Sequence, residues 1–245
     1  MNQDEIDVEL RTPPEVRARI LVLSAILRRL AIENAPPEDA GDRLGDAFDE
    51  REWLREHGLA GELTSWEAAL LSSPPGTLAQ DAIVEASWQG EALVALAWAI
   101  GALDMPPVDA PSDPRPIIDV VPRPWEAVRD WMSDPVMVSD SSAAQEREFA
   151  EIWHWRATTE LLRRDRSAID RHDYESAIRE VATEALAAGI VSSLRAGDFE
   201  ARNRSVSDLS DAEVDELIAV TGQRLHALNW LCGFGDSWDA VPLDV

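Results

Sequence analysis

The stretch Ala92–Leu103, which reads ALVALAWAIGAL, is the longest apolar run in the 245-residue sequence. Its twelve residues are too few to cross a bilayer as a helix, which takes about 20. A helix that is apolar on every side is normally buried inside a protein. We therefore predict that a helix over about Ala79–Leu103 forms the centre of a helical core.

Other helices are indicated on both sides of this run. Some starts carry a capping box, in which a Ser or Thr precedes a Glu by three residues and the two side chains bond each other's backbone N–H groups. Apolar residues then recur at helical spacing until a Gly or Pro interrupts them. The predicted helices cover residues 13–35, 44–57, 65–73, 79–103, 125–132, 142–166, 174–188 and 211–232, and the boxes are Thr12 with Glu15, Thr64 with Glu67, and Ser210 with Glu213.

Residues 104–124 contain seven of the fifteen prolines. Because proline disrupts a regular helix, this segment is predicted to be a linker or strap between two helical halves, with one short strand over Ile117–Val121. The predicted fold is all-α: a single compact multi-helix bundle with a Pro-rich strap and at most one short strand pair. Residues 1–11 are predicted to form an acidic tail that precedes a single helical domain over 12–245.

The composition is strongly acidic, with 47 Asp and Glu against 22 Arg and a formal net charge of −25. A field of this sign repels phosphates and anionic lipids, so neither nucleic acid nor a membrane is an expected partner. It favours a basic protein partner. A surface adapted to solubility or salt tolerance is the simpler explanation of the same charge.

The single cysteine, Cys232, excludes an intrachain disulfide and a cysteine-based zinc site. It follows an apolar helical run, which favours a buried structural thiol. Residues Met1–Glu9 are acidic and lack an apolar core, so no signal peptide is expected. These features together predict a cytoplasmic protein.

No Gly-rich phosphate loop, His-Glu-x-x-His or Gly-x-Ser-x-Gly motif occurs. The candidate functional residues are instead polar groups set in apolar helices. Glu91, close to Ser87 and Trp88, is a candidate proton-transfer group or metal ligand. It is equally a candidate for one half of a buried ion pair, because a buried carboxylate needs a partner. Arg156 is one candidate for that partner.

His154 and Arg156 form a second candidate group, in which His154 fits either a general base or a residue hydrogen-bonded within a helix interface. The third group lies near the C-terminus, where Asn229 is expected to be buried and hydrogen-bonded. The tail carboxylates are expected to cap helix ends or to line a pocket. With His154 and His226 they could also bind a metal, but their spacing is not diagnostic, and no metal and no cofactor is predicted. This third group comprises Arg224, His226, Asn229, Trp230, Asp236, Trp238 and Asp239.

These residues fall into three blocks that together resemble the bacterial domain of unknown function 4272 family. The resemblance runs from about Arg11 to the C-terminus, departs at Gln223 and Val245, where Glu and Thr are usual, and implies a helical single-domain protein without implying an activity. The blocks are Ser87-Trp88-x-x-Glu91-Ala92-Leu93 with Leu96–Gly101, then His154-Trp155-Arg156, then Arg224-x-His226-Ala227-Leu228-Asn229-Trp230-Leu231-x-Gly233-x-Gly235 with Trp238-Asp239-x-Val241-Pro242-x-Asp244.

Two functional hypotheses follow from the sequence. The first is a protein-binding or regulatory module, immunity- or antitoxin-like, whose acidic surface docks a basic partner. The alternative is an enzyme with an unrecognised site, for instance a metal-dependent hydrolase, in which Glu91, His154, Arg224 and His226 converge in one pocket. A third hypothesis that fits the charge is a protein that mimics nucleic acid, which requires two rows of acidic residues on the surface.

Overall fold

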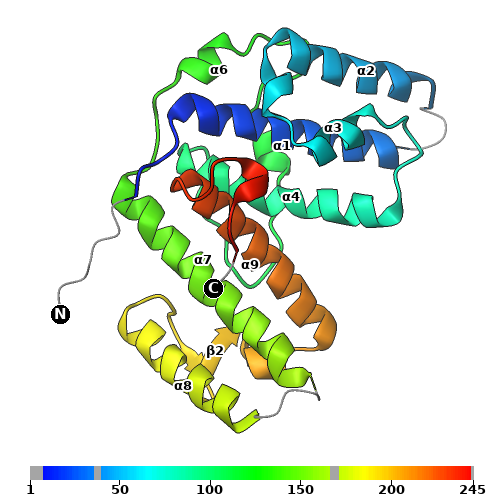
Figure 1. The fold of residues 1–245 in the computed structure, drawn as a ribbon. Helices are drawn as coiled ribbons and strands as arrows, with labels where there is room; N and C mark the ends of the chain where they lie inside the picture. The colour runs from blue at the N-terminus through cyan, green and yellow to red at the C-terminus, as the bar shows by residue number, and fades with distance from the viewer. Residues whose placement is uncertain (1–7, 36–39, 166–170, 244–245) are drawn as a thin grey trace.

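Two long helices, α7 (Asp140–Arg164) and α9 (Asp211–Leu231), lie side by side and connect the two ends of the molecule (Figure 1). This is a computed structural model, and it describes residues 8–35, 40–165 and 171–243. At one end α9 packs on α4 (Gln80–Ala99), which in turn packs on α1 (Pro13–Asn34). The predicted mostly helical fold is therefore confirmed. Most of the predicted acidic tail, residues 1–7, lies outside the described residues.

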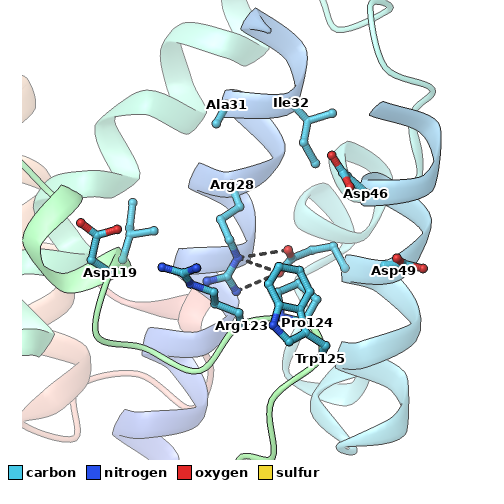
Figure 2. Close-up of a pocket in the computed structure, with 11 residues that line it drawn as sticks. Arg28, Ala31, Ile32, Asp46, Asp49, Asp119, Arg123, Pro124 and Trp125 are labelled. Atoms are coloured by element: carbon cyan, nitrogen blue, oxygen red, sulfur yellow. Dashed lines mark hydrogen bonds and ion pairs between the residues drawn. The ribbon is translucent and has the colours of Figure 1, made fainter. Parts of the chain in front are cut away.

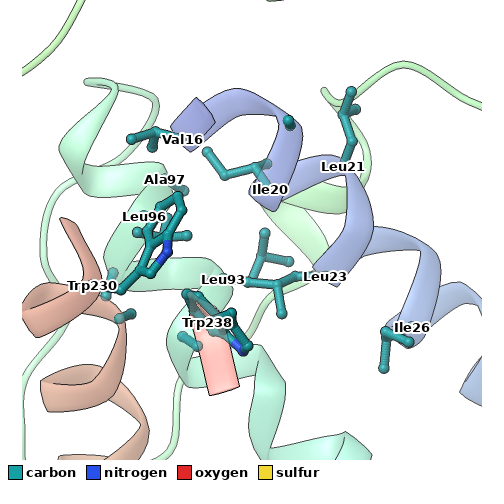
Figure 3. Close-up of a cluster of buried hydrophobic side chains, with 14 of the residues drawn as sticks. Val16, Ile20, Leu21, Leu23, Ile26, Leu93, Leu96, Ala97, Trp230 and Trp238 are labelled. Carbon is teal, nitrogen blue, oxygen red and sulfur yellow. The ribbon is translucent and has the colours of Figure 1, made fainter. Parts of the chain in front are cut away.

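The larger hydrophobic core surrounds α4, as the apolar run predicts. Every residue from Ala92 to Ala97 is fully buried. Leu23 of α1, Leu228 of α9 and Trp238 of the tail belong to the same cluster (Figure 3). The helix ends at Ala99, earlier than predicted, because Gly101 adopts a left-handed conformation with φ 71°. Around this core lie α2 (Ala40–Glu56), the 3-10 helix η2 (Leu59–Glu62), α3 (Ser65–Ser72) and α6 (Arg129–Ser133).

All three predicted capping boxes are present. At α9, the backbone N–H of Glu213 donates to the Ser210 hydroxyl, and the Glu213 carboxylate accepts from the Ser210 backbone N–H at 2.8 Å. Equivalent boxes begin α1 at Thr12 and α3 at Thr64. These contacts satisfy backbone donors that the first turn of a helix leaves unpaired. Because the contacts depend on residues close together in the sequence, the sequence predicted the first residue of each of these three helices correctly.

A smaller core lies at the other end of α7 and α9. Trp153 of α7 contacts Phe199 edge to face, with ring centroids 5.1 Å apart. Residues of α8 (Arg171–Ala187) and of the first half of α9 complete this cluster, which includes Ala182, Val206 and Leu217. The 3-10 helices η3 (Val206–Asp208) and η4 (Trp238–Ala240) flank the two ends of α9 in sequence.

The strand prediction was wrong in number and in place. A three-stranded antiparallel sheet, in the order β1-β2-β3, is formed by β1 (Leu194–Arg195), β2 (Asp198–Ala201) and β3 (Arg204–Ser205). Both connections have two residues, and all of them have positive φ: Ala196 and Gly197 in the first turn, Arg202 and Asn203 in the second. Such turns match the twist of a tight hairpin. In the sequence, only Gly197 and Asn203 indicated these turns, because Gly and Asn adopt positive φ more readily than other residues.

The Pro-rich segment was also predicted incorrectly in part. Residues Arg115–Ile118 form a short helix, α5, where a strand was expected. Pro116 falls in its first turn, where the missing N–H costs no hydrogen bond. The helix α6 begins at Arg129 rather than at Trp125, and α2 extends back to Ala40. In the described parts of the chain, no helix combines the length and the apolar character needed to span a membrane.

Candidate functional site

Glu91 and Arg224 form a buried ion pair between α4 and α9. The Nε and Nη2 atoms of Arg224 both lie 2.9 Å from Glu91 Oε2, and both residues are at most 3% exposed. Sequence reasoning predicted a buried partner for Glu91 but named Arg156. The partner is Arg224 because α9, and not α7, packs along the apolar face of α4.

The same two side chains fix the Pro-rich segment onto the helices. Arg224 Nη1 donates to the carbonyls of Pro106 and Pro107 at 2.9 and 3.1 Å. Its Nη2 donates to the Ser112 hydroxyl at 2.8 Å and to the Ala110 carbonyl at 3.5 Å. With the Glu91 contact, every N–H of this guanidinium therefore has an acceptor. Glu91 in turn accepts from the Ser112 backbone N–H at 2.6 Å.

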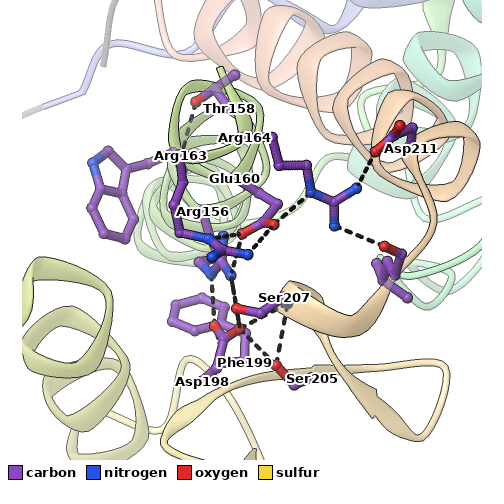
Figure 4. Close-up of polar contacts among 12 residues, drawn as sticks. Arg156, Thr158, Glu160, Arg163, Arg164, Asp198, Phe199, Ser205, Ser207 and Asp211 are labelled. Carbon is purple, nitrogen blue, oxygen red and sulfur yellow. Dashed lines mark hydrogen bonds and ion pairs between the residues drawn. The ribbon is translucent and has the colours of Figure 1, made fainter. Parts of the chain in front are cut away.

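Arg156 belongs to a different buried network, in the smaller core (Figure 4). Its Nε and Nη2 atoms donate to the two carboxylate oxygens of Asp198 at 2.6 and 2.7 Å, and Nη2 also lies 3.1 Å from Glu160. Burial alone would raise the pKa of Asp198, but the bonds and charge of Arg156, with the bonds from Ser207, lower it to about 2. This network joins α7 to the sheet.

The two histidines make separate contacts. His154 Nδ1 lies 3.1 Å from the Thr221 hydroxyl of α9, beside Gly222. His226 Nε2 lies 2.8 Å from the Trp238 carbonyl. Burial lowers the pKa of both imidazoles, so both are neutral near pH 7. Each histidine is held in an interface between structural elements.

The remaining C-terminal candidates attach the tail to the bundle. The Asn229 side-chain amide donates to the Pro242 carbonyl at 2.9 Å, and its oxygen accepts from Arg147 at 3.1 Å. Trp230 and Trp238 meet edge to face at 5.4 Å between ring centroids. Asp236 and Asp239 are exposed and have no hydrogen bond or ion pair with other described residues, and together with Trp230 and Trp238 they line a cavity of about 250 Å³. Trp88 is half-buried on α4.

The candidate catalytic residues therefore do not converge on one site. Glu91 and Arg224 are brought together, whereas His154, Arg156 and His226 each bond to other partners. Among the residues that the structure describes, no group of three or more His, Cys, Asp or Glu is placed to hold a metal ion.

A groove that sequence reasoning missed lies between α1, α2 and the segment around α5. We call it the acidic groove (Figure 2). Its cavity has a volume of about 310 Å³. Trp125 stands at its edge with 75% of its surface exposed, more than any other large hydrophobic residue of the described chain. The lining residues are Arg28, Ala31, Ile32, Asp46, Asp49, Glu50, Ile118, Asp119, Arg123, Pro124 and Trp125.

The charges of the acidic groove do not cancel. Arg28 and Glu50 form a bidentate pair in its wall, with Nε–Oε2 and Nη2–Oε1 distances of 3.0 and 2.9 Å. Burial raises the pKa of Glu50, against the opposing effect of Arg28. The exposed Asp46, Asp49 and Asp119 have no hydrogen bond or ion pair with other described residues. With Arg123 counted as the one further cation, the lining carries an excess of two negative charges.

These features define the class: a mostly helical, strongly acidic protein with an internally bonded polar interior. A family model described as Domain of unknown function (DUF4272) matches residues 1–183, about three quarters of the chain, and the protein belongs to this family. The match includes the first two sequence blocks and ends before the third. No curated protein and no solved structure matches the chain significantly.

Proposed function

We propose that this protein is a binding module whose acidic groove docks a basic, amphipathic segment of another protein. The observation that carries the proposal is Trp125, a large aromatic residue left 75% exposed at the edge of a cavity with an acidic rim. Exposed aromatic residues beside a pocket are typical centres of protein interfaces. Binding of this kind would be the basis of a regulatory or immunity-type role.

The anchoring of Trp125 supports a preformed site. The indole N–H of Trp53 on α2 donates to the Glu126 carbonyl at 3.0 Å, directly after Trp125. The Arg123 backbone N–H donates to the Glu126 carboxylate at 2.9 Å, which closes a local turn. A fixed segment loses little conformational entropy when a partner binds. The backbone on both sides of the exposed indole is thus fixed before any partner arrives.

The charge of the whole chain supports a basic partner. At least fourteen of the 22 arginines are in ion pairs with carboxylates of the same chain, including Arg28, Arg156 and Arg224. The excess of acidic residues over arginines therefore includes, among the described residues, exposed carboxylates without an ion pair, such as Asp46, Asp49 and Asp119. Such a surface raises the association rate of a cationic partner.

The cavity size indicates how the partner fits. A volume of about 310 Å³ is near the lower end of the range for ligand pockets, about 300–1,000 Å³. It accommodates a few apolar side chains from one face of a helix, while Lys or Arg residues on the flanks meet Asp46, Asp49 and Asp119. This arrangement corresponds to helix-in-groove recognition.

The enzyme alternative has less support. Its candidate residues are bonded to one another or to backbone carbonyls, and the histidines lie in separate interfaces. A catalytic group has to be within hydrogen-bond reach of a substrate. We therefore assign these residues to the maintenance of the fold.

The test is isothermal titration of a synthetic amphipathic Leu/Lys helix into the full chain. The same peptide with Glu in place of Lys and a scrambled peptide of equal composition serve as controls. We expect binding of the basic amphipathic peptide alone, weakened at least about tenfold between about 50 mM and about 500 mM salt. Equal binding of the scrambled peptide would contradict the helix-in-groove arrangement.

A pair of charge variants locates the site. Asp46→Asn with Asp49→Asn is expected to weaken peptide binding about tenfold and to reduce its salt dependence. The matched control, Asp208→Asn with Asp215→Asn, removes two exposed charges from the other end of the molecule and should change binding less than about twofold. Equal losses in both variants would mean that the general acidic surface, and not the groove, attracts the peptide.

A further inference from the structure

A second cavity lies where the two hydrophobic cores meet, away from the acidic groove. Its walls come from the Pro-rich segment at Met105–Val108, from α7, from the loop at 189–192 and from α9. The cavity volume is about 480 Å³, within the range of about 300–1,000 Å³ for small-molecule sites. We call it the central cleft. It does not depend on the function proposed above.

The walls of the central cleft are mostly apolar. Phe149 and Trp153 of α7 contribute aromatic surface, and Val108, Val191 and Leu228 contribute aliphatic surface. The Pro-rich wall is held in place at both ends: Arg224 binds the carbonyls of Pro106 and Pro107, and the Asp109 carboxylate accepts from the backbone N–H of Arg202 at 2.8 Å. The cleft is therefore a preformed apolar cavity and not a gap between loose segments.

Two charged side chains line this cleft, and they differ in whether they are already bonded to other residues. Arg224 is already saturated, because all its N–H groups donate to Glu91, Ser112 and backbone carbonyls. It has no donor left for an anion, and it is already ion-paired with Glu91. Glu146 has neither a hydrogen bond nor an ion pair with any other described residue. The cleft consequently contains one carboxylate whose oxygens have no bonded partner, and Arg224 acts on it only through its charge.

We infer that the central cleft binds a small organic ammonium compound, with its apolar body against Phe149 and Trp153 and its N–H donors on Glu146. An ammonium group supplies both the missing charge and the missing hydrogen bonds, and aromatic walls favour cations. Burial raises the pKa of Glu146, with Arg224 opposing the shift, which agrees with a carboxylate that lacks a partner.

The experiment uses three probes of similar shape: 2-phenylethylamine, its neutral analogue 2-phenylethanol, and the anion phenylacetate. Each is titrated into the full chain and followed by ligand-observed NMR. A probe of this size is expected to bind with a dissociation constant of about a millimolar. The amine should bind about tenfold more tightly than the alcohol, and phenylacetate should bind more weakly than both.

Three variants assign the site. Glu146→Gln preserves the shape of the side chain, and it should abolish the advantage of the amine over the alcohol. Glu148→Gln, on the exposed side of the same helix, should leave that advantage unchanged. Ser192→Trp adds a large side chain at an exposed position of the cleft wall, and it should block both the amine and the alcohol. The thermal midpoint of each variant shows that it is folded.

The proposal is overturned by any of three results: no detectable binding of the amine at about 10 mM, equal affinity for amine and alcohol in the unaltered chain, or an amine preference that survives Glu146→Gln. Tighter binding of phenylacetate than of the amine would also overturn it, because Arg224 would then be the group that recognises the ligand.

Discussion

The central polar network and the acidic groove use the same residue types in opposite ways. In the first, Glu91 and Arg224 are buried and bonded to each other and to the Pro-rich segment. In the second, Asp46 and Asp49 are exposed and unbonded beside the exposed indole of Trp125. The polar residues set in the apolar helices are thus bonded within the fold, while the groove proposed for binding is lined by unbonded residues of a helix and a loop.

The largest effect is expected from breaking the central network. Arg224→Met leaves Glu91 buried without its partner, and such a loss typically costs about 3–5 kcal/mol of unfolding free energy. Urea denaturation measures it. The control is Arg115→Met, which removes an exposed Arg–Asp pair from the same Pro-rich segment and should leave the urea midpoint nearly unchanged, because a solvent-screened ion pair contributes little to stability. Similar losses in both variants would contradict a special role for Arg224.

The next largest effect is expected at the second buried network, where Asp198 binds Arg156. The pKa of Asp198 is about 2 in the folded chain, against about 3.9 in an unfolded one. The depressed pKa therefore corresponds to a stabilisation of about 2–3 kcal/mol above about pH 5, and this contribution is lost as the pH falls from about 5 towards 2.

Asp198→Asn should thus destabilise the protein by about 2–4 kcal/mol at pH 7. The difference from the unaltered chain should shrink as the pH is lowered to about 3. Denaturation curves at a series of pH values measure this difference. If the difference in unfolding free energy between variant and unaltered chain stayed constant with pH, the ionised carboxylate would not be the stabilising group.

A smaller effect is expected where His154 approaches α9. A Cβ atom at Gly222 would lie 3.1 Å from the His154 Cε1 atom, and the histidine is buried and bonded to Thr221. Overpacking lowers the unfolding free energy by about 1–3 kcal/mol. The higher helix propensity of Ala raises it by about 1 kcal/mol. Gly222→Ala is therefore expected to lower the unfolding free energy by up to about 2 kcal/mol. A stabilised variant would mean that His154 moves aside freely.

The smallest effect on stability is expected in the groove. Trp125 is 75% exposed, so Trp125→Ala should change the unfolding free energy by no more than about 0.5 kcal/mol. Thermal denaturation of the variant provides the measurement. A large destabilisation would show that the indole packs on the protein, and the contrast between interior and groove would then disappear.

The sequence predicted the parts of the fold that depend on local signals. The capping boxes located the starts of α1, α3 and α9, and the apolar run identified the buried helix α4. The sheet was missed because its strands have two to four residues and their turns include Ala196 and Arg202, which rarely adopt positive φ.

The candidate site was predicted less well, for physical reasons. Periodicity shows that Glu91 needs a buried partner, but the choice between Arg156 and Arg224 depends on which helix packs on α4. Trp125 and Glu146 carry no local signal at all. The exposure of Trp125 and the lack of a bonded partner for Glu146 result from the tertiary arrangement of segments far apart in sequence.

The most direct test of the binding proposal is the affinity of Trp125→Ala for the basic amphipathic peptide, measured by isothermal titration beside Leu162→Ala, which truncates another half-exposed apolar residue. We predict a loss of at least about thirtyfold for Trp125→Ala, as expected for an interface centre, and less than about twofold for Leu162→Ala. Unchanged affinity in Trp125→Ala, or an equal loss in both variants, would contradict the assignment of the acidic groove as the binding site.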